Sequence, residues 1–303
     1  MLSYSVVICT LDRTEDLKRC ISSWMVQEPR PKDIVVVHGR PEGMLEEPLK
    51  KLLADTGIEL LYIKMSPALV HQRNAGALKA KGDIVFFADD DAVYMEGYAR
   101  TIVDVYMQDT AGKVGGVQGT IDNFENHSEA DRWGLARLFM LGRVGNGSLQ
   151  PSGWPAFYRP GVDVYQVEVF SGAAMSYRKD ILQHHQFDEK LARYWVGDDF
   201  EMAYRVSREF RLLQASKARL HHYISPLGRD GLRRQAKMGV VNHLYLIRKC
   251  FGLSWRSRLC WGWSEIGSVV VALLCIMRGM GPARLLGLID GYRELLLGGN
   301  PSL

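Results

Sequence analysis

Short apolar runs alternate with amphipathic stretches through the first third of the chain. Strands are predicted where the apolar positions are continuous, at residues 5–10, 33–37, 58–63 and 83–88. A helix is predicted at residues 17–25, where apolar side chains share one face, and a second at residues 69–80. Strands that are apolar on both faces and alternate with helices indicate a parallel sheet covered on both sides. The predicted fold class is therefore α/β.

The pattern becomes looser beyond residue 110. Strand-like runs occur at residues 115–121 and 164–175, and a helix is predicted at residues 199–210. Residues 123–165 are rich in Gly, Pro, Trp and Tyr without a clean period, which is typical of loops around a pocket. From residue 229 onward the sequence is helical in character and increasingly apolar.

Composition limits the class of protein. The chain has 303 residues, 47% of them hydrophobic, which is enough for one large domain with an appendage. We expect an α/β domain over residues 1–228 and a C-terminal helical region over residues 229–303. The net charge of +4 does not mark a nucleic-acid binder. Five cysteines without a C-x-x-C pair fit reduced thiols in the cytosol, and a strand at residues 5–10 argues against a signal peptide.

Three adjacent carboxylates follow the predicted strand at residues 83–88. Asp89, Asp90 and Asp91 repel one another, so a positive group must offset the cost if they converge. Asp89 and Asp91 share one side of an extended chain, and carboxylate oxygens suit Mg²⁺ or Mn²⁺. Ligands bind at the carboxyl ends of the strands in open α/β sheets, and a metal there would neutralise a leaving nucleoside diphosphate. An acidic helix start gives the same pattern. We expect these side chains to face the surface.

A second acidic cluster opens the helix predicted at residues 199–210. Asp198 and Asp199 begin it, and Glu201 lies in its first turn. Sugar transfer with inversion needs a carboxylate to accept the proton of the acceptor hydroxyl, and this cluster is compatible with that need. The alternative is an ordinary acidic helix N-terminus.

Two further groups could complete a site. Neighbouring side chains in a strand point to opposite faces, and His222 is in phase with the apolar positions before it, whereas His221 is not. His222 can therefore be a metal ligand or a polar strand end. Arg73 and Asn74 lie at the start of the helix predicted at residues 69–80, where a cation and free amides suit a phosphate, unless they only cap the helix.

The ordered set of motifs resembles the family 2 glycosyltransferases, which have the GT-A fold with a Rossmann-like, mostly parallel sheet. The likeness extends over residues 4–225. The matching segments, in chain order, are the opening strand with Thr10, Asp12 and Arg13, the segments Arg73–Gly76 and Lys81–Ile84, the aspartate triplet, residues 171–178, and the pair Asp198 and Asp199.

The resemblance implies inversion by a single displacement from a nucleotide-sugar, and a role for each site residue. Thr10, Asp12, Arg13 and His38 would line the nucleoside pocket; Asp89, Asp91 and His222 would hold Mn²⁺ or Mg²⁺; Arg73, Asn74 and Asp90 would fix the donor sugar and phosphates; and Asp199 would be the base. The family usually has Asp where this chain has His38, so UDP, dTDP and GDP donors all stay open. Asp198 likewise replaces the usual Glu.

Two other classes of function compete with this interpretation. A nucleotidyltransferase would also use nucleotides and metals, but it would normally carry a glycine-rich phosphate loop after the first strand, and residues 10–17 contain no glycine. A nucleotide-sugar binding module without turnover would not need the acidic pair Asp198 and Asp199.

The C-terminal region suggests a place of action. Thirteen Lys or Arg stand against two acids, Glu209 and Asp230, between Arg205 and Arg258. Residues 259–277 are apolar with a single charge, Glu265, and residues 282–297 are amphipathic. A basic face beside apolar helices predicts peripheral contact with an anionic cytoplasmic membrane, which fits a lipid-linked saccharide acceptor in cell-surface polysaccharide assembly.

The same features leave two alternatives for the C-terminal region. One is a helical subdomain packed on the α/β domain or forming a homo-oligomer. The other is a transmembrane span, which Glu265 disfavours because a charge at the bilayer centre costs about 2.5–3.5 kcal/mol.

Overall fold

The computed structural model describes residues 2–11, 13–40, 42, 44–123, 129–158, 163–191, 197–223, 231–252 and 254–297. Its central feature is one sheet in the order β10-β12-β6-β11-β4-β1-β2-β3, with β5 paired to β12. The predicted boundary at residue 228 lies outside the described residues.

The first half of the sheet is parallel. β1 (Tyr4–Thr10) pairs with β2 (Asp33–His38) on one side and β4 (Ile84–Asp89) on the other, and β3 (Glu59–Lys64) extends the edge beyond β2. All four strands run the same way, so their carboxyl ends share one edge. The helices of this half are α1 (Thr14–Met25), α2 (Glu46–Leu53) and α3 (Leu69–Lys79).

Close packing brings α3 against the sheet. A Cβ on Gly76 would lie 2.3 Å from Val7 Cγ1 and 3.2 Å from Val37 Cγ2, so only glycine allows this approach. Trp24 of α1 is fully buried on the opposite face, 5.3 Å between ring centroids from Phe86 of β4. The strands are therefore covered on both faces, as their continuous apolar sequence predicts.

The second half of the sheet is mixed. β11 (Met175–Arg178) lies antiparallel between β4 and β6 (Val114–Ile121), and β12 (Arg211–His222) runs parallel to β6. The other elements are β5 (Ala92–Tyr94), α4 (Tyr98–Gln108), β10 (Val164–Val167), α7 (Lys179–His184), the 3-10 turn Glu189–Leu191 and α8 (Asp198–Val206).

A small second sheet lies where loops were predicted. It contains β7 (Arg143–Gly145), β8 (Ser148–Leu149) and β9 (Pro155–Tyr158), preceded by the short helices α5 (Glu129–Arg132) and α6 (Leu135–Leu138). The predicted run at residues 164–175 is also wrong as one strand, because β10 and β11 occupy different positions in the main sheet. The predicted helix at residues 199–210 ends at Val206, because the chain enters β12 at Arg211.

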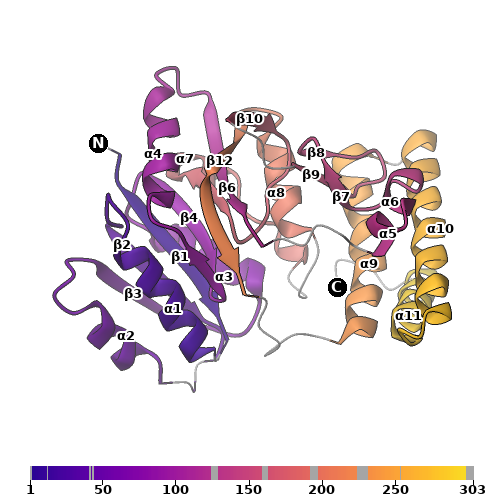
Figure 1. Ribbon diagram of the computed structural model, residues 1–303, viewed down its shortest axis with the longest axis horizontal. Helices are drawn as coiled ribbons and strands as arrows, with labels where there is room; N and C mark the ends of the chain where they lie inside the picture. Colours follow the sequence, from indigo (N-terminus) through magenta and orange to yellow (C-terminus); the bar gives the residue numbers. More distant parts are fainter. Residues whose placement is uncertain are drawn as a thin grey trace.

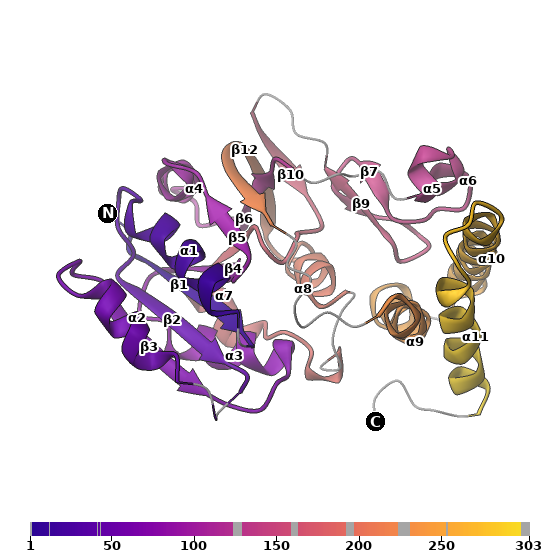
Figure 2. The same cartoon turned by 60° about the horizontal axis from the view of Figure 1, so that its bottom comes forward.

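Three helices follow the α/β domain: α9 (Leu232–Phe251), α10 (Trp255–Met277) and α11 (Ala283–Leu296). Figure 1 and Figure 2 show them together at the end of the molecule opposite β3 and α2, with the small sheet beside them. Within the described chain, α10 is the one helix long and apolar enough to cross a membrane, and 33% of its most apolar stretch is buried.

The charge within α10 has partners on both neighbouring helices. Glu265 Oε1 lies 2.5 Å from Nδ1 of His243 on α9, and its Oε2 accepts a hydrogen bond of 2.6 Å from the Tyr292 hydroxyl on α11. His243 Nε2 also contacts the backbone carbonyl of Ser152, next to the small sheet. Glu265 therefore joins α9, α10 and α11 into one packed unit.

Candidate active site

A cavity of about 670 Å³ lies at the carboxyl edge of the parallel strands. One half is lined by the aspartate triplet, by Arg13 and Arg73, by residues 171–173 and 197–200, and by His222. The other half is lined by the small sheet and by α9, α10 and α11. The cavity therefore joins the two parts of the molecule that the sequence analysis treated separately.

The structure brings the three predicted metal ligands together. Among the described residues, Asp89, Asp91 and His222 form the one group whose ligand atoms all lie within 4.8 Å of one another. His222 Nε2 lies 2.8 Å from Asp91 Oδ1 and 3.6 Å from Asp89 Oδ2. β5 pairs with β12 in the register that sets Ala92 opposite His222, which fixes this approach. Two carboxylates and an imidazole form a donor set for a divalent metal.

The triplet is more buried than expected. Asp90 and Asp91 are 1% and 2% exposed, and Asp89 is partly exposed. Asp90 Oδ2 accepts a hydrogen bond of 2.6 Å from the Thr10 hydroxyl, and Arg13 Nη1 lies 3.3 Å from Asp90 Oδ1 and 2.8 Å from Asp91 Oδ2. The prediction that these carboxylates face the surface is wrong for Asp90 and Asp91, because Thr10 and Arg13 hold them from within. Burial raises the pKa of Asp90 to about 7, while Arg13 and the Thr10 hydrogen bond oppose that rise.

The predicted base lies across the cavity on the first turn of α8. Asp199 Oδ2 accepts a hydrogen bond of 2.9 Å from the Gly172 amide, and its Oδ1 accepts one of 2.9 Å from the Phe200 amide. Arg73 is buried and contacts Asp198, and its Nη2 lies 3.7 Å from Asp89 Oδ1. Arg73 therefore bridges the two acidic clusters.

The environment of Asp199 suits a proton acceptor. Burial and the neighbouring Asp198 raise the pKa of Asp199 to about 6, whereas Arg73 and the two backbone hydrogen bonds lower it. A carboxylate with a pKa of about 6 is ionised at neutral pH and is a stronger base than an exposed aspartate.

Gly172 makes this arrangement sterically feasible. A Cβ there would lie 2.5 Å from Arg73 Nη2 and 3.5 Å from Asp199 Oδ2. Gly172 therefore lets Arg73 pass close to the backbone, and its own amide orients the carboxylate of Asp199.

Two predicted nucleotide ligands, Asn74 and His38, are not among the residues that line the cavity. Asn74 does not line the cavity: its amide exchanges hydrogen bonds of 3.0 Å and 2.9 Å with the Phe187 backbone. His38 is fully buried at the end of β2, with Nδ1 2.7 Å from the Tyr62 hydroxyl. Asp12 lies outside the described residues.

Sequence reasoning missed three contributors to the site. It gave no role to Asp198, which holds Arg73, and it did not single out the Gly172 amide within residues 171–178. It also treated the C-terminal helices as separate from the pocket that they line. The sequence did carry a signal for the role of Asp198. Two adjacent carboxylates repel each other, so one of the pair is expected to contact a cation such as Arg73.

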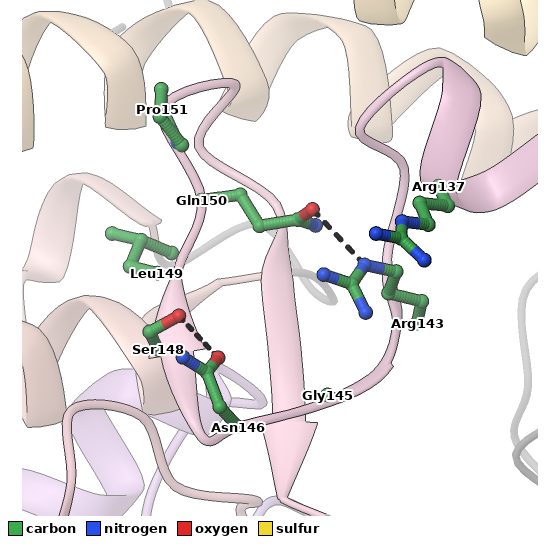
Figure 3. Close-up of a pocket in the computed structure, with 8 residues that line it drawn as sticks. All are labelled: Arg137, Arg143, Gly145, Asn146, Ser148, Leu149, Gln150 and Pro151. Carbon is green, nitrogen blue, oxygen red and sulfur yellow. Dashed lines mark hydrogen bonds between the residues drawn. The ribbon is translucent and has the colours of Figure 1, made fainter.

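A second hollow of about 540 Å³ adjoins the small sheet. Figure 3 shows its lining, in which Arg143 Nε donates a hydrogen bond of 3.3 Å to Gln150 Oε1 and the Ser148 hydroxyl donates one of 2.6 Å to Asn146 Oδ1. Arg137 lines the same hollow. Arg143 also lines the main cavity, so it stands between the two.

Comparison with known families decides the class of protein. The family described as Glycosyl transferase family 2 matches residues 5–186, which is more than half of the chain. The chain belongs to this family. It is therefore a glycosyltransferase rather than a nucleotidyltransferase. A curated relative from Bacillus subtilis (strain 168), the uncharacterized glycosyltransferase YwdF, is 24% identical over 253 residues and covers 82% of each chain.

Solved structures confirm the GT-A fold of this glycosyltransferase. GalNAc-T7 with UDP, GalNAc and Mn²⁺ has a TM-score of 0.58 at 16% identity; the alignment covers 88% of this chain and 55% of that one, so this chain spans about half its length. The mannosyltransferase PcManGT from Pyrobaculum calidifontis, with GDP-Man and Mn²⁺, has a TM-score of 0.59 at 14% identity, and the alignment covers 97% of this chain and 87% of that one. S. aureus TarS 1-349 has a TM-score of 0.53 at 11% identity, and the alignment covers 98% of this chain and 92% of that one.

Proposed function

We propose that this glycosyltransferase moves a sugar from a nucleoside-diphosphate sugar to a hydroxyl of a saccharide or lipid-linked saccharide, with inversion at the anomeric carbon. The observation that carries the proposal is the meeting of the cluster Asp89, Asp91 and His222 with Asp199 in one cavity. Such an activity would serve cell-surface polysaccharide or glycan assembly.

The donor set of the cluster fits Mn²⁺ or Mg²⁺ as cofactor. Asp89, Asp91 and His222 would hold the ion, and Arg13 and Arg73 already offset the negative charge around it. When bound, a divalent cation stabilises the negative charge of a leaving diphosphate. The Mn²⁺ in the GalNAc-T7 and PcManGT structures supports this assignment.

Asp199 would act on the acceptor. Its carboxylate accepts the proton of the acceptor hydroxyl as that oxygen forms a bond to the anomeric carbon and the bond to the diphosphate breaks. The Gly172 and Phe200 amides leave each carboxylate oxygen a further lone pair for the acceptor. Attack from the face opposite the diphosphate inverts the configuration without a covalent intermediate.

Arg13 and Arg73 would bind the donor phosphates, and Asp90 would orient the donor sugar. Both arginines line the cavity beside the aspartate triplet, where a nucleoside diphosphate needs positive charge. Thr10 would act through Asp90, which its hydroxyl holds. The UDP and GDP-Man in the neighbouring structures support a nucleotide-sugar donor, with UDP, dTDP and GDP as the candidates for this chain.

A nucleotide-sugar panel tests this function. Purified protein with Mn²⁺ should release nucleoside diphosphate from at least one UDP-, dTDP- or GDP-sugar, and NMR of the transferred sugar should show the anomeric configuration opposite to the donor. Retention of configuration would refute the proposed displacement. Release of pyrophosphate in place of a nucleoside diphosphate would refute the proposed bond cleavage.

The proposed place of action is the cytoplasmic face of an anionic membrane. The outer side of α10 carries apolar side chains spaced to form one stripe: Trp255, Leu259, Trp263, Ile266, Leu273 and Met277, exposed by 67%, 63%, 42%, 54%, 46% and 81%. Arg256, Arg258 and Arg278 flank the stripe. Amphipathic helices with basic flanks bind anionic lipid surfaces.

Sedimentation with anionic liposomes at low and high salt tests this placement. Binding at low salt that Leu259→Glu abolishes supports it, provided that Leu78→Glu, at a comparably exposed leucine on α3, binds as the parent does. Protein that stays in the supernatant under both conditions and is monodisperse without detergent refutes membrane contact. A discrete dimer in that experiment would assign the stripe to a homo-oligomer.

A further inference from the structure

Apolar side chains form one wall of the far half of the cavity, beside the polar side chains of Gln235, Ser268 and Trp154. The apolar wall contains Val240 of α9, Val271 of α10, Leu288 of α11, Leu141, and Phe157 of β9. A saccharide packed against this apolar wall would leave the hydroxyls that face it without partners, at a cost of about 1–3 kcal/mol each. The chemistry of this half therefore suits an apolar chain.

The charge balance of the same half is positive. Glu265 is the acid that lines it, and His243 and Tyr292 already satisfy both of its oxygens. Arg143 and Arg284 line the cavity too, and among the described residues neither forms an ion pair with an acid. An anionic group on the ligand would match these two guanidinium groups.

Continuity with the acidic half identifies which ligand would lie there. The apolar wall and Asp199 belong to one cavity of about 670 Å³, a size within the range of small-molecule sites. A single molecule can therefore occupy the apolar half and also reach Asp199. In the proposed function that molecule is the acceptor.

We propose that the acceptor is an amphipathic, phosphate-linked lipid whose apolar chain lies between α9–α11 and β9, with its anionic linkage near Arg143 and Arg284. This proposal rests on the proposed function and decides between its two acceptor classes. The exposed apolar stripe of α10 is the outer side of a helix whose inner side lines the cavity, so a membrane surface there would present such a lipid next to its binding site.

Gly239 offers a test that fills the apolar half without removing a contact. It lies on α9, lines the cavity, and a Cβ there meets nothing within 4 Å. Gly262 of α10 is the matched control, because its Cβ also meets nothing within 4 Å and it is not among the residues that line the cavity. Replacing a helical glycine by a larger residue also improves helix propensity, so neither change should cost stability.

Binding of monomeric dodecyl phosphate, measured by calorimetry in the absence of liposomes, is the readout. Gly239→Phe should weaken binding at least about tenfold, equivalent to about 1.4 kcal/mol, with Gly239→Ala intermediate and Gly262→Phe unchanged. Arg284→Gln should weaken binding of dodecyl phosphate but not of uncharged dodecanol, and Arg284→Lys should restore it. Equal binding by the Gly239 and Gly262 variants, or binding of maltose in preference to dodecyl phosphate, would overturn the proposal.

The donor reaction separates this proposal from the proposed function. Both glycine variants should still release nucleoside diphosphate from the donor at the parental rate in the absence of acceptor, because Gly239 does not belong to the acidic half. If Gly239→Phe alone loses dodecyl phosphate binding, the lipid site is supported. If, in addition, neither the parent nor any variant turns over the donor, the proposed function is refuted, and with it the role of the lipid as acceptor.

Discussion

The two halves of the cavity are built in opposite ways. The acidic half is made of strand ends and one helix start, and its charged groups hold one another through ion pairs such as Arg13 with Asp91. The helical half has an apolar wall built from elements distant in sequence, and Glu265, the acid described in its lining, contacts His243 and Tyr292. Under the proposed function, the acidic half would perform the transfer, and the helical half would select the acceptor.

The largest effect should come from the acidic half. Asp91→Asn keeps the shape of the side chain but removes a metal-ligand charge and its ion pair with Arg13. We expect transfer to fall by roughly 10³-fold or more, because a bound cation contributes several kcal/mol to stabilising the leaving group. Steady-state release of nucleoside diphosphate measures the loss. If the variant keeps a tenth of the parental activity, Asp91 is not a metal ligand.

Asp199→Asn should lower kcat by about 10²–10⁴-fold and leave donor affinity nearly unchanged, since a base acts in the chemical step. Asp180→Asn is the matched control: Asp180 also lies in the first turn of a helix and its Oδ1 accepts a hydrogen bond from the next amide, Ile181. The measurement is kcat beside donor titration. A parallel loss of donor affinity would make Asp199 a donor ligand or a structural residue.

Gly172→Ala should reduce kcat by about 10²-fold with little change in melting temperature. The added methyl group displaces Arg73, which contacts Asp198 beside the base, and a misplacement of about 1 Å can cost this much in rate. Gly262→Ala, a site in α10 where a Cβ meets nothing within 4 Å, controls for the loss of a glycine as such. Unchanged kinetics in the Gly172 variant would show that this close approach does not position the base.

The smallest effect concerns pH. Asp199 must be deprotonated to act as a base, and its pKa is raised to about 6, so kcat should fall as pH drops through about 6 and be level above it. Asp198→Asn removes a neighbouring negative charge and should move this midpoint to lower pH. A pH profile of kcat in both proteins measures the shift. An identical midpoint in the two proteins would assign the titration to another group.

The acidic half could be predicted from the sequence because its signals are local. An aspartate triplet after an apolar strand places carboxylates at the carboxyl edge of the sheet. Because side chains alternate along a strand, the sequence predicted that His222 and not His221 points toward them, and His222 does lie beside Asp89 and Asp91. The burial of Asp91 was not predictable in the same way, because it depends on Arg13, 78 positions earlier in the chain.

The helical half had no comparable local signal. β7, β8 and β9 are two to four residues long, which is too short to show an alternating pattern of apolar and polar residues. The sequence of residues 123–165 therefore predicted loops. The apolar positions of α9, α10 and α11 predict helices, but whether they face a core, a lipid or a cavity depends on how the helices pack. Glu265 illustrates this: it argued against a membrane span in the sequence, and in the structure it joins three helices.

Metal dependence tests the central claim most directly. Nucleoside diphosphate release from the best donor of the panel should vanish in excess chelator and return when Mn²⁺ or Mg²⁺ is added beyond the chelator. His222→Ala should raise the metal concentration needed for half-maximal activity, because it removes one of the three proposed ligands. Full activity of the parent enzyme in excess chelator would contradict the account.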